Sequence, residues 1–463
     1  MTPAEKVAKV WLPWKLAGLQ RQDIEEAMGY DRVGWYYEVG TGKTACSTVT
    51  ALAWDCQRIY VVVPPIIIPQ WEAWLRTVKQ DDISIFRGPK RVAADLNHKW
   101  VVMSHRNFTD SFQTIYNNSP KHFCVIIDEA QWLKNPSSLL FKYTKRLAFG
   151  QKLQLLTGTR TSKPEDAYAY CNLIPGLYRS MSQWKNLHVV EEDFFGKPVN
   201  YRDLEVVAAN MKIQTFTRTK KDMFGYDLTP IYTVIPYELA KAHEKLYDKL
   251  AEEQLLLLTD GQKIDATSAT KLAHALQQIV CNWDKFSGEP KRSAVFDVID
   301  EAISETECLD PGRSKLVIWT HYVATSDAVV KYLKEQHSDG AIAAAYGKVN
   351  SAKGVKSFET DPACRILVAQ PSSCGVGAEF QFVCSEMLFI EIATTSMAAR
   401  QAVGRVDRKG QLTRPNIRLA QALRTVQVRL FAKLLRNDDL IADIEQSEIS
   451  LRDMIFGVYS NSP

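Results

Sequence analysis

The segment Glu38-Val39-Gly40-Thr41-Gly42-Lys43-Thr44 decides the fold prediction. Its glycines allow backbone N–H groups to wrap around phosphate oxygens, and the helix predicted to follow, residues 45–54, adds the positive end of its dipole. Lys43 is expected to reach the β and γ phosphates, and the Thr44 hydroxyl to bind Mg²⁺. We therefore predict a site for ATP lined by Gly40, Thr41, Gly42, Lys43 and Thr44. The alternative is a chance glycine loop that ends in an exposed lysine.

A second segment, Cys124-Val125-Ile126-Ile127-Asp128-Glu129-Ala130-Gln131, places two acids at the end of an apolar strand. Ligands of open α/β sheets bind at the carboxyl ends of the strands, so the position suits a nucleotide site. Asp128 is expected to hold Mg²⁺, and Glu129 to orient and polarise the attacking water. Alone, the pair could equally be a solvated strand end. Together with an upstream phosphate loop it favours hydrolysis of a nucleotide.

On both sides of these two segments, short apolar runs alternate with helical stretches. This alternation predicts parallel sheets covered by helices. The runs are nearly continuous in Val, Ile and Leu, as strands buried on both faces should be. The predicted strands span residues 59–63, 100–103, 123–127, 153–156, 315–319, 341–345, 365–369, 387–391 and 416–420.

A region of different composition separates the two groups of strands. Residues 240–281 are rich in Ala, Leu, Lys, Glu and Gln and have helical periodicity, interrupted by the polar stretch 259–269. A further helix is expected at residues 426–445. We predict an α/β protein with a first lobe at residues 1–236, a helical bridge at 237–290 and a second lobe at 291–463.

The composition argues against several other classes of protein. No apolar run approaches the roughly 18 residues of a membrane span, and the amino terminus lacks the apolar core of a signal peptide. The 463 residues include nine cysteines but no CxxC pair, which argues against a disulfide framework or a zinc site. The net charge of +4 is too small to predict nucleic-acid binding by itself. We expect an intracellular protein that makes no use of a membrane, in a bacterial or phage setting.

Several longer motifs carry a resemblance to one family. The stretch VVPPIIIPQW at residues 62–71, the LKNP continuation at 133–136 and QAVGRVDRKGQ at 401–411 resemble the Swi/Snf-type DNA translocases of helicase superfamily two. The resemblance runs from about residue 16 to residue 445. It implies two RecA-like lobes in tandem, with ATP bound in the cleft between them.

The resemblance also implies roles for individual residues. In the family, the two arginines of the last motif, here Arg405 and Arg408, face the triphosphate across the cleft. An arginine donated from outside the phosphate loop is worth roughly 10³–10⁵ in rate, and the alternative is a basic helix face. The family pattern assigns further nucleotide contacts to Gln20, Gln131 and Gly377. It assigns DNA contacts to Pro64, Gln70, Trp71, Ser104, Thr157, Gly158, Arg218, Lys220, Lys221 and Gly375.

Four positions depart from the family pattern. Gln131 and Asp407 each replace a His, Arg160 replaces a Pro, and Glu379 replaces an Asn or Asp. None removes a group needed for hydrolysis, but Gln131 and Glu379 are placed to weaken the coupling between turnover and movement.

Three functions fit these observations. The first is an ATP-driven translocase on double-stranded or branched DNA, held by contacts to the phosphate backbone rather than to bases. The second is a strand-separating helicase on single-stranded DNA or RNA. The third is a nucleotide-gated DNA-binding subunit of a larger complex.

Overall fold

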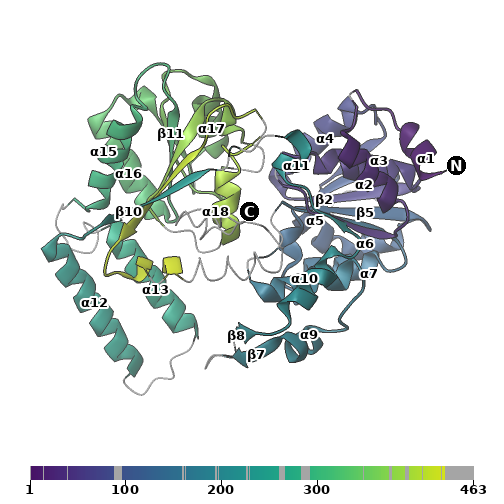
Figure 1. The fold of residues 1–463 in the computed structure, drawn as a ribbon, viewed down its shortest axis with the longest axis horizontal. Helices are drawn as coiled ribbons and strands as arrows, with labels where there is room; N and C mark the ends of the chain where they lie inside the picture. Colours follow the sequence, from purple (N-terminus) through teal and green to yellow (C-terminus); the bar gives the residue numbers. More distant parts are fainter. Residues whose placement is uncertain are drawn as a thin grey trace, which may run out of the picture. The chain divides into compact units, whose positions relative to one another are not determined.

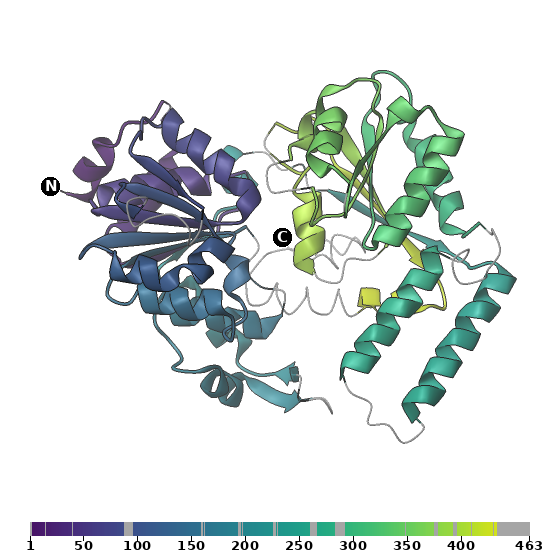
Figure 2. The same ribbon diagram turned by 180° about the vertical axis from the view of Figure 1, so that it is seen from behind.

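The computed structural model describes residues 2–432 except 14, 39, 88–95, 159–160, 162, 193–195, 197, 226–227, 229, 260–265, 283–291, 348, 375–377, 392–395, 409 and 429. The chain forms two compact units, with the main division between residues 227 and 228 and the short segment 192–197 grouped with the second unit. Each unit is built on a parallel sheet with helices packed on its faces (Figures 1 and 2). This arrangement confirms the predicted α/β class with two RecA-like lobes.

In the described part of the first unit, seven strands form a sheet of order β3-β4-β2-β5-β6-β1-β9, and every neighbouring pair is parallel. The strands are β1 (Arg32–Trp35), β2 (Arg58–Val63), β3 (Ile83–Phe86), β4 (Trp100–Ser104), β5 (Phe123–Asp128), β6 (Lys152–Leu156) and β9 (Thr215–Phe216). β7 (Val189–Glu192) and β8 (Pro198–Tyr201) form a separate pair. The helices are α1 (Pro3–Ala8), α2 (Gly18–Ala27), α3 (Lys43–Ala53), η1 (Pro65–Ile67), α4 (Ile68–Thr77), α5 (His105–Asp110), α6 (Phe112–Asn117), η3 (Ala130–Leu133), α7 (Leu139–Leu147), η4 (Pro164–Asp166), α8 (Ala167–Leu173), α9 (Met181–His188), α10 (Leu204–Lys212) and α11 (Lys220–Phe224).

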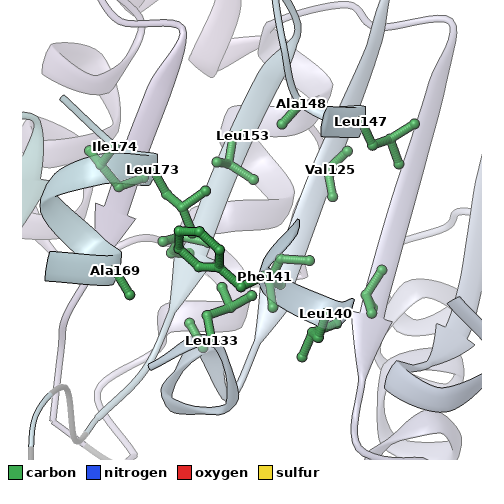
Figure 3. Packing of buried hydrophobic residues seen from close by; sticks show 14 of the residues in the cluster. Val125, Leu133, Leu140, Phe141, Leu147, Ala148, Leu153, Ala169, Leu173 and Ile174 are labelled. Atoms are coloured by element: carbon green, nitrogen blue, oxygen red, sulfur yellow. The ribbon is translucent and has the colours of Figure 1, made fainter. Parts of the chain in front are cut away.

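A large apolar core fixes the sheet of the first unit against α5, α6, α7, α8 and α10. Leu140, Phe141 and Leu147 of α7 belong to one buried cluster with Val125 of β5 and Leu153 of β6 (Figure 3). Each such side chain contributes about 1.5–3 kcal/mol when it is fully buried. The strands that end beside the phosphate loop are therefore held in a rigid core.

In the described part of the second unit, six strands form a sheet of order β10-β15-β14-β11-β13-β12, again parallel throughout. They are β10 (Ile231–Tyr237), β11 (Lys315–Trp319), β12 (Ile342–Ala345), β13 (Ile366–Ala369), β14 (Cys384–Phe389) and β15 (Asn416–Ala422). The helices are α12 (Lys241–Thr259), α13 (Ala266–Cys281), α15 (Val295–Thr306), α16 (Val323–Gln336), η5 (Asp339–Ala341), α17 (Ser351–Thr360), η6 (Phe380–Phe382) and α18 (Ser396–Val403). Residues of α13, α15 and α16 share one buried cluster with the sheet, and residues of α17 and α18 share another.

The predicted domain boundaries need correction. β10, assigned to the first lobe by the boundary at residue 236, pairs with β15 over its whole length and belongs to the second unit. The two helices of the predicted bridge form a hairpin (Figure 1). Tyr247 of α12 and Ile279 of α13 lie in the same buried cluster as Leu316 of β11. The hairpin is therefore part of the second unit, because its apolar face packs against that unit's core.

Helix α17 packs unusually close to strand β12. A Cβ atom on Gly354 would lie 2.0 Å from the carbonyl oxygen of Ala344 in β12, far inside van der Waals contact. Only glycine allows α17 to lie this near the strand.

All nine cysteines are free thiols and buried. Among the described residues, no helix is both long enough and apolar enough to span a bilayer. A helix was predicted at residues 426–445. Its part from residue 433 on lies outside the described residues.

Candidate functional site

The phosphate loop follows β1 and leads into α3. Gly40 and Gly42 have φ angles of 84° and 95°, in the left-handed region that glycine adopts at little cost. A Cβ atom on Gly42 would also lie 2.3 Å from Nε2 of Gln20. The φ angle of Gly42 therefore favours glycine at this position, while the Gln20 amide is the end of a flexible side chain that could move aside.

Lys43, the first residue of α3, points back into this loop. Its Nζ donates to the carbonyl oxygens of Tyr37 at 2.9 Å and Glu38 at 3.1 Å. Thr44 follows in the first turn of α3, where unpaired backbone N–H groups and the helix dipole favour an anion. The ammonium group and the helix terminus thus lie at the same point of the chain, as phosphate binding requires.

Gln20 joins α2 to the phosphate loop. Its Oε1 accepts a hydrogen bond from the Ala17 N–H at 3.0 Å, and its Nε2 donates to the Thr41 carbonyl at 3.0 Å. Gln20 therefore contacts the phosphate loop, while its contact with a nucleotide stays a prediction.

Asp128 ends β5 and is 8% exposed. Its Oδ2 accepts a hydrogen bond from the indole Nε1 of Trp71 at 2.8 Å, and its Oδ1 accepts one from the Glu129 N–H at 2.9 Å. Burial and the neighbouring Glu129 carboxylate raise the pKa of Asp128, while these two donors and the Lys43 ammonium oppose the rise. Asp128 and Trp35, the last residue of β1, both pair with Leu156 of β6, so the acid and the strand that leads into the phosphate loop end at the same edge of the sheet.

Asp128 and Thr44 offer the hard oxygen ligands that Mg²⁺ prefers. The described residues contain no group of three or more His, Cys, Asp or Glu side chains suited to a metal ion. That fits magnesium, which is commonly held by one or two carboxylates, waters and the phosphates of the substrate. The residues present therefore suit Mg²⁺ bound together with a nucleotide.

A chain of hydrogen bonds runs from Glu129 to the end of β6. Glu129 has a φ of 53°, a strained value for a residue with a side chain, and its carboxylate accepts a hydrogen bond from Nε2 of Gln131. Oε1 of Gln131 accepts a hydrogen bond from the Thr157 hydroxyl at 2.8 Å. Gln131 and Thr157 are both buried. The glutamine that replaces the family's histidine thus joins the acid to the Thr157 segment.

Three of the predicted DNA contacts have partners within the first unit. Trp71 is 1% exposed, and its indole N–H donates to Asp128. The Ser104 side chain is buried and caps α5 by accepting a hydrogen bond from the Asn107 N–H at 3.0 Å. The Arg218 guanidinium forms an ion pair with Asp23, and 27% of the Arg218 side chain stays exposed. Trp71 and Ser104 are therefore buried within the unit, while a DNA contact by Arg218 stays a prediction.

The other predicted DNA contacts differ in their exposure. Gln70 and Lys221 are exposed, Gly158 and Lys220 are half-buried, and Pro64 and Thr157 are buried. Gly375 and the predicted nucleotide contact Gly377 lie outside the described residues, as does Arg160.

In the second unit, the last motif folds back on the segment that contains Glu379. Arg408 donates to the Ala378 carbonyl at 3.4 Å and pairs with the Glu379 carboxylate at 3.4 Å. Arg405 is buried, and its carbonyl accepts a hydrogen bond from the Phe380 N–H at 3.1 Å. Glu379, one of the departures from the family pattern, therefore supplies a charged partner for Arg408.

Sequence reasoning missed one more neighbour of the acids. His105, the first residue of α5, lies with its Nε2 3.3 Å from the Asp128 carbonyl oxygen. Burial lowers the pKa of His105 to about 4, so the ring is neutral at physiological pH. No motif singles out this histidine, because its place beside β5 comes from the packing of α5 on the sheet.

The sequence of the chain matches a known protein family. A family model described as the SNF2-related domain matches residues 38–285 of the chain. The chain belongs to this family. The matched span begins at the phosphate loop and includes both acids, so the resemblance inferred from the motifs is confirmed.

Curated relatives of this SNF2-related chain are distant in sequence. An uncharacterized ATP-dependent helicase of Mycoplasma genitalium is 22% identical over 413 residues, which cover 85% of this chain and 38% of that protein. Chromodomain-helicase-DNA-binding protein 7 of Gallus gallus is 23% identical over 252 residues, 48% of this chain and 8% of that protein. The chain spans less than half the length of the curated relatives it matches.

Among solved structures, the chain is similar to the Sulfolobus solfataricus SWI2/SNF2 ATPase core in complex with dsDNA. The identity is 19%, the coverage is 94% of both chains and the TM-score is 0.42. The family match and the names of the relatives support an ATP-hydrolysing enzyme, an SNF2-family helicase or translocase core.

Proposed function

We propose that this SNF2-related chain uses ATP hydrolysis to move along double-stranded or branched DNA. One observation carries the hydrolytic half of the proposal. Asp128 at the end of β5 and Trp35 at the end of β1, the strand that leads into the phosphate loop, both pair with Leu156 of β6 in one sheet. A phosphate loop and a buried acid at one site are what phosphoryl transfer requires.

In the proposed reaction, the loop amides and Lys43 bind the phosphates of ATP. Lys43 exchanges the carbonyls of Tyr37 and Glu38 for charged phosphate oxygens, which are the stronger partners. Mg²⁺, held by Thr44 and Asp128 together with the phosphates, would neutralise charge that develops on the transferred group. Glu129 orients the attacking water.

The second unit is proposed to complete the reaction with Arg405 and Arg408. Phosphoryl transfer spreads negative charge over the γ phosphate, and guanidinium groups stabilise that charge. Alternate closing and opening around the nucleotide would then drive stepping.

The proposal that the chain moves along DNA is supported by the name of a relative, chromodomain-helicase-DNA-binding protein 7. On this chain, the predicted contacts that keep exposed or half-buried side chains are Gln70, Arg218, Lys220 and Lys221. Contacts from such side chains to the phosphate backbone allow movement without dependence on base identity.

The test measures ATP turnover with duplex DNA, single-stranded DNA, RNA and no nucleic acid, beside a triplex-displacement assay on duplex DNA. We expect the strongest stimulation by duplex DNA, displacement of the third strand, and complete loss of turnover in Lys43→Ala. Normal turnover in that variant would show that the phosphate loop is wrongly assigned. Stronger stimulation by single strands or RNA favours a strand-separating helicase, and background turnover with every nucleic acid favours a nucleotide-gated binding subunit.

A further inference from the structure

The segment that follows β9 is attached to the residues just before the phosphate loop. The Arg218 carbonyl accepts a hydrogen bond from the Glu38 N–H at 2.9 Å, and the Lys220 N–H donates to Oε2 of Glu38 at 2.7 Å. Glu38 therefore holds residues 218–220 through both its backbone and its side chain. The chain continues from this segment into the second unit.

A buried carboxylate anchors the same segment to α2. The Arg218 guanidinium binds both oxygens of Asp23, with Nε 2.9 Å from Oδ2, and the Tyr37 hydroxyl donates to Asp23 as well. Since Asp23 is 1% exposed, the loss of its hydration must be offset by these partners. Asp23 lies three residues after Gln20, on the same side of α2. Arg218 is thus fixed to the helix that also contacts the phosphate loop.

Lys43 contacts Tyr37 and Glu38, the two residues that link the phosphate loop to this segment. Lys43 donates to the carbonyls of Tyr37 and Glu38, while Tyr37 contacts Asp23 and Glu38 contacts residues 218 and 220. A triphosphate in the loop would attract the Lys43 ammonium away from these carbonyls. The same triphosphate would repel the nearby Glu38 carboxylate, because the two anions would lie on one short loop.

We propose that Glu38 and Arg218 are positioning residues that transmit occupancy of the phosphate loop to residues 217–224, the start of the connection to the second unit. The inference rests on the proposed function, because it takes ATP as the ligand of the loop. Binding of the triphosphate weakens the bond between the Glu38 carboxylate and the Lys220 N–H and frees the start of α11, while Asp23 keeps Arg218 in place. Without nucleotide, the connection stays attached to the loop.

Amide hydrogen exchange of the full chain tests this, with and without Mg²⁺ and the non-hydrolysable analogue AMP-PNP. Peptides covering residues 36–46 and 215–224 are followed separately. We expect the first peptide to become protected and the second to exchange more than about threefold faster. No protection of residues 36–46 would mean that the proposed nucleotide site is wrong. Protection there, with unchanged or slower exchange at 215–224, overturns the inference alone.

A pair of matched variants tests the role of the carboxylate. Glu38 is exposed, so Glu38→Gln keeps the fold while it removes the charge. The control is Glu25→Gln, which removes an exposed ion pair with Arg21 on α2. In Glu38→Gln we expect AMP-PNP affinity within about threefold of wild type, loss of the exchange response at 215–224, and a kcat for DNA-stimulated hydrolysis lower by about tenfold with KM for ATP little changed. If Glu38→Gln matches Glu25→Gln in exchange and in kcat, the inference fails.

Discussion

At the scale of single residues, the contact between Trp71 and Asp128 bears most directly on the proposed chemistry. A buried indole N–H is a fixed donor that holds one oxygen of the carboxylate in place. Trp71, which was predicted to contact DNA, is buried and donates to an acid of the proposed hydrolytic site.

Replacing Trp71 with Phe keeps an aromatic ring in the core but removes this donor. We expect ATP turnover to fall by a factor of about 10 to 100, because a hydrogen bond to a charged group contributes roughly 1.5–3 kcal/mol. Steady-state hydrolysis and far-ultraviolet circular dichroism check this. The control is Trp74→Phe on the same helix, which removes a hydrogen bond of 2.9 Å to the Thr48 hydroxyl. Equal turnover in the two variants would argue against a specific role for the Trp71 indole.

Gln131 and Thr157 are expected to act as one unit. Gln131→Ala removes the link to Glu129, and Thr157→Val removes the hydroxyl that orients Gln131. We expect each variant to lower DNA-stimulated hydrolysis, and the double variant to be no slower than the worse single variant. Rates of the four proteins form a double-mutant cycle. Strictly additive losses would show that the two side chains act independently.

Sequence patterns located the residues of the phosphate loop and the acids, because those roles depend on short continuous segments. They did not identify the partners of Trp71 or Arg218. Trp71 meets Asp128 across 57 positions of the chain, and Arg218 meets Asp23 across 195. Such pairs arise only when α4 packs on the sheet and β9 joins its edge.

At the scale of helices and strands, apolar runs predicted the inner strands well. β2, β4, β5 and β6 lie within one residue of the predicted bounds, since they are buried on both faces. β10 was missed because its residues are exposed or half-buried and include Pro236, as an edge strand permits. β1 was missed because Arg32 and Gly34 interrupt its apolar pattern.

The close packing of α17 on β12 gives a prediction at this scale. Gly354→Ala should destabilise the protein by about 1–3 kcal/mol, because overpacking against a backbone carbonyl outweighs the better helix propensity of alanine. Thermal denaturation measures the effect. The control is Gly18→Ala in α2, where a Cβ atom meets nothing within 4 Å and a neutral or stabilising effect is expected. Unchanged or higher stability in Gly354→Ala would contradict the prediction.

At the scale of the whole molecule, the proposal divides one reaction between two units. The first unit supplies the phosphate loop and the acids, and the second supplies Arg405 and Arg408. Nucleotide binding and hydrolysis should therefore be separable by substitution in the second unit.

Arg408→Ala tests this separation. We expect hydrolysis to fall by a factor of about 10³ or more, because the arginine stabilises charge only in the transition state. AMP-PNP affinity should stay close to that of wild type in a fluorescence titration. The control is Arg313→Gln, which removes an exposed ion pair with Glu307 in the same unit. Hydrolysis by Arg408→Ala at the rate of that control would contradict a catalytic role for Arg408.

The burial of the cysteines has a practical consequence for watching the protein at work. Burial raises the pKa of the thiol of Cys46 and of Cys384 to about 12, so little of the reactive thiolate forms at neutral pH. Maleimide dyes should leave the nine native thiols of the folded chain largely unmodified. A single cysteine introduced on the surface would then take up the dye selectively, which would allow single-molecule fluorescence without a cysteine-free background.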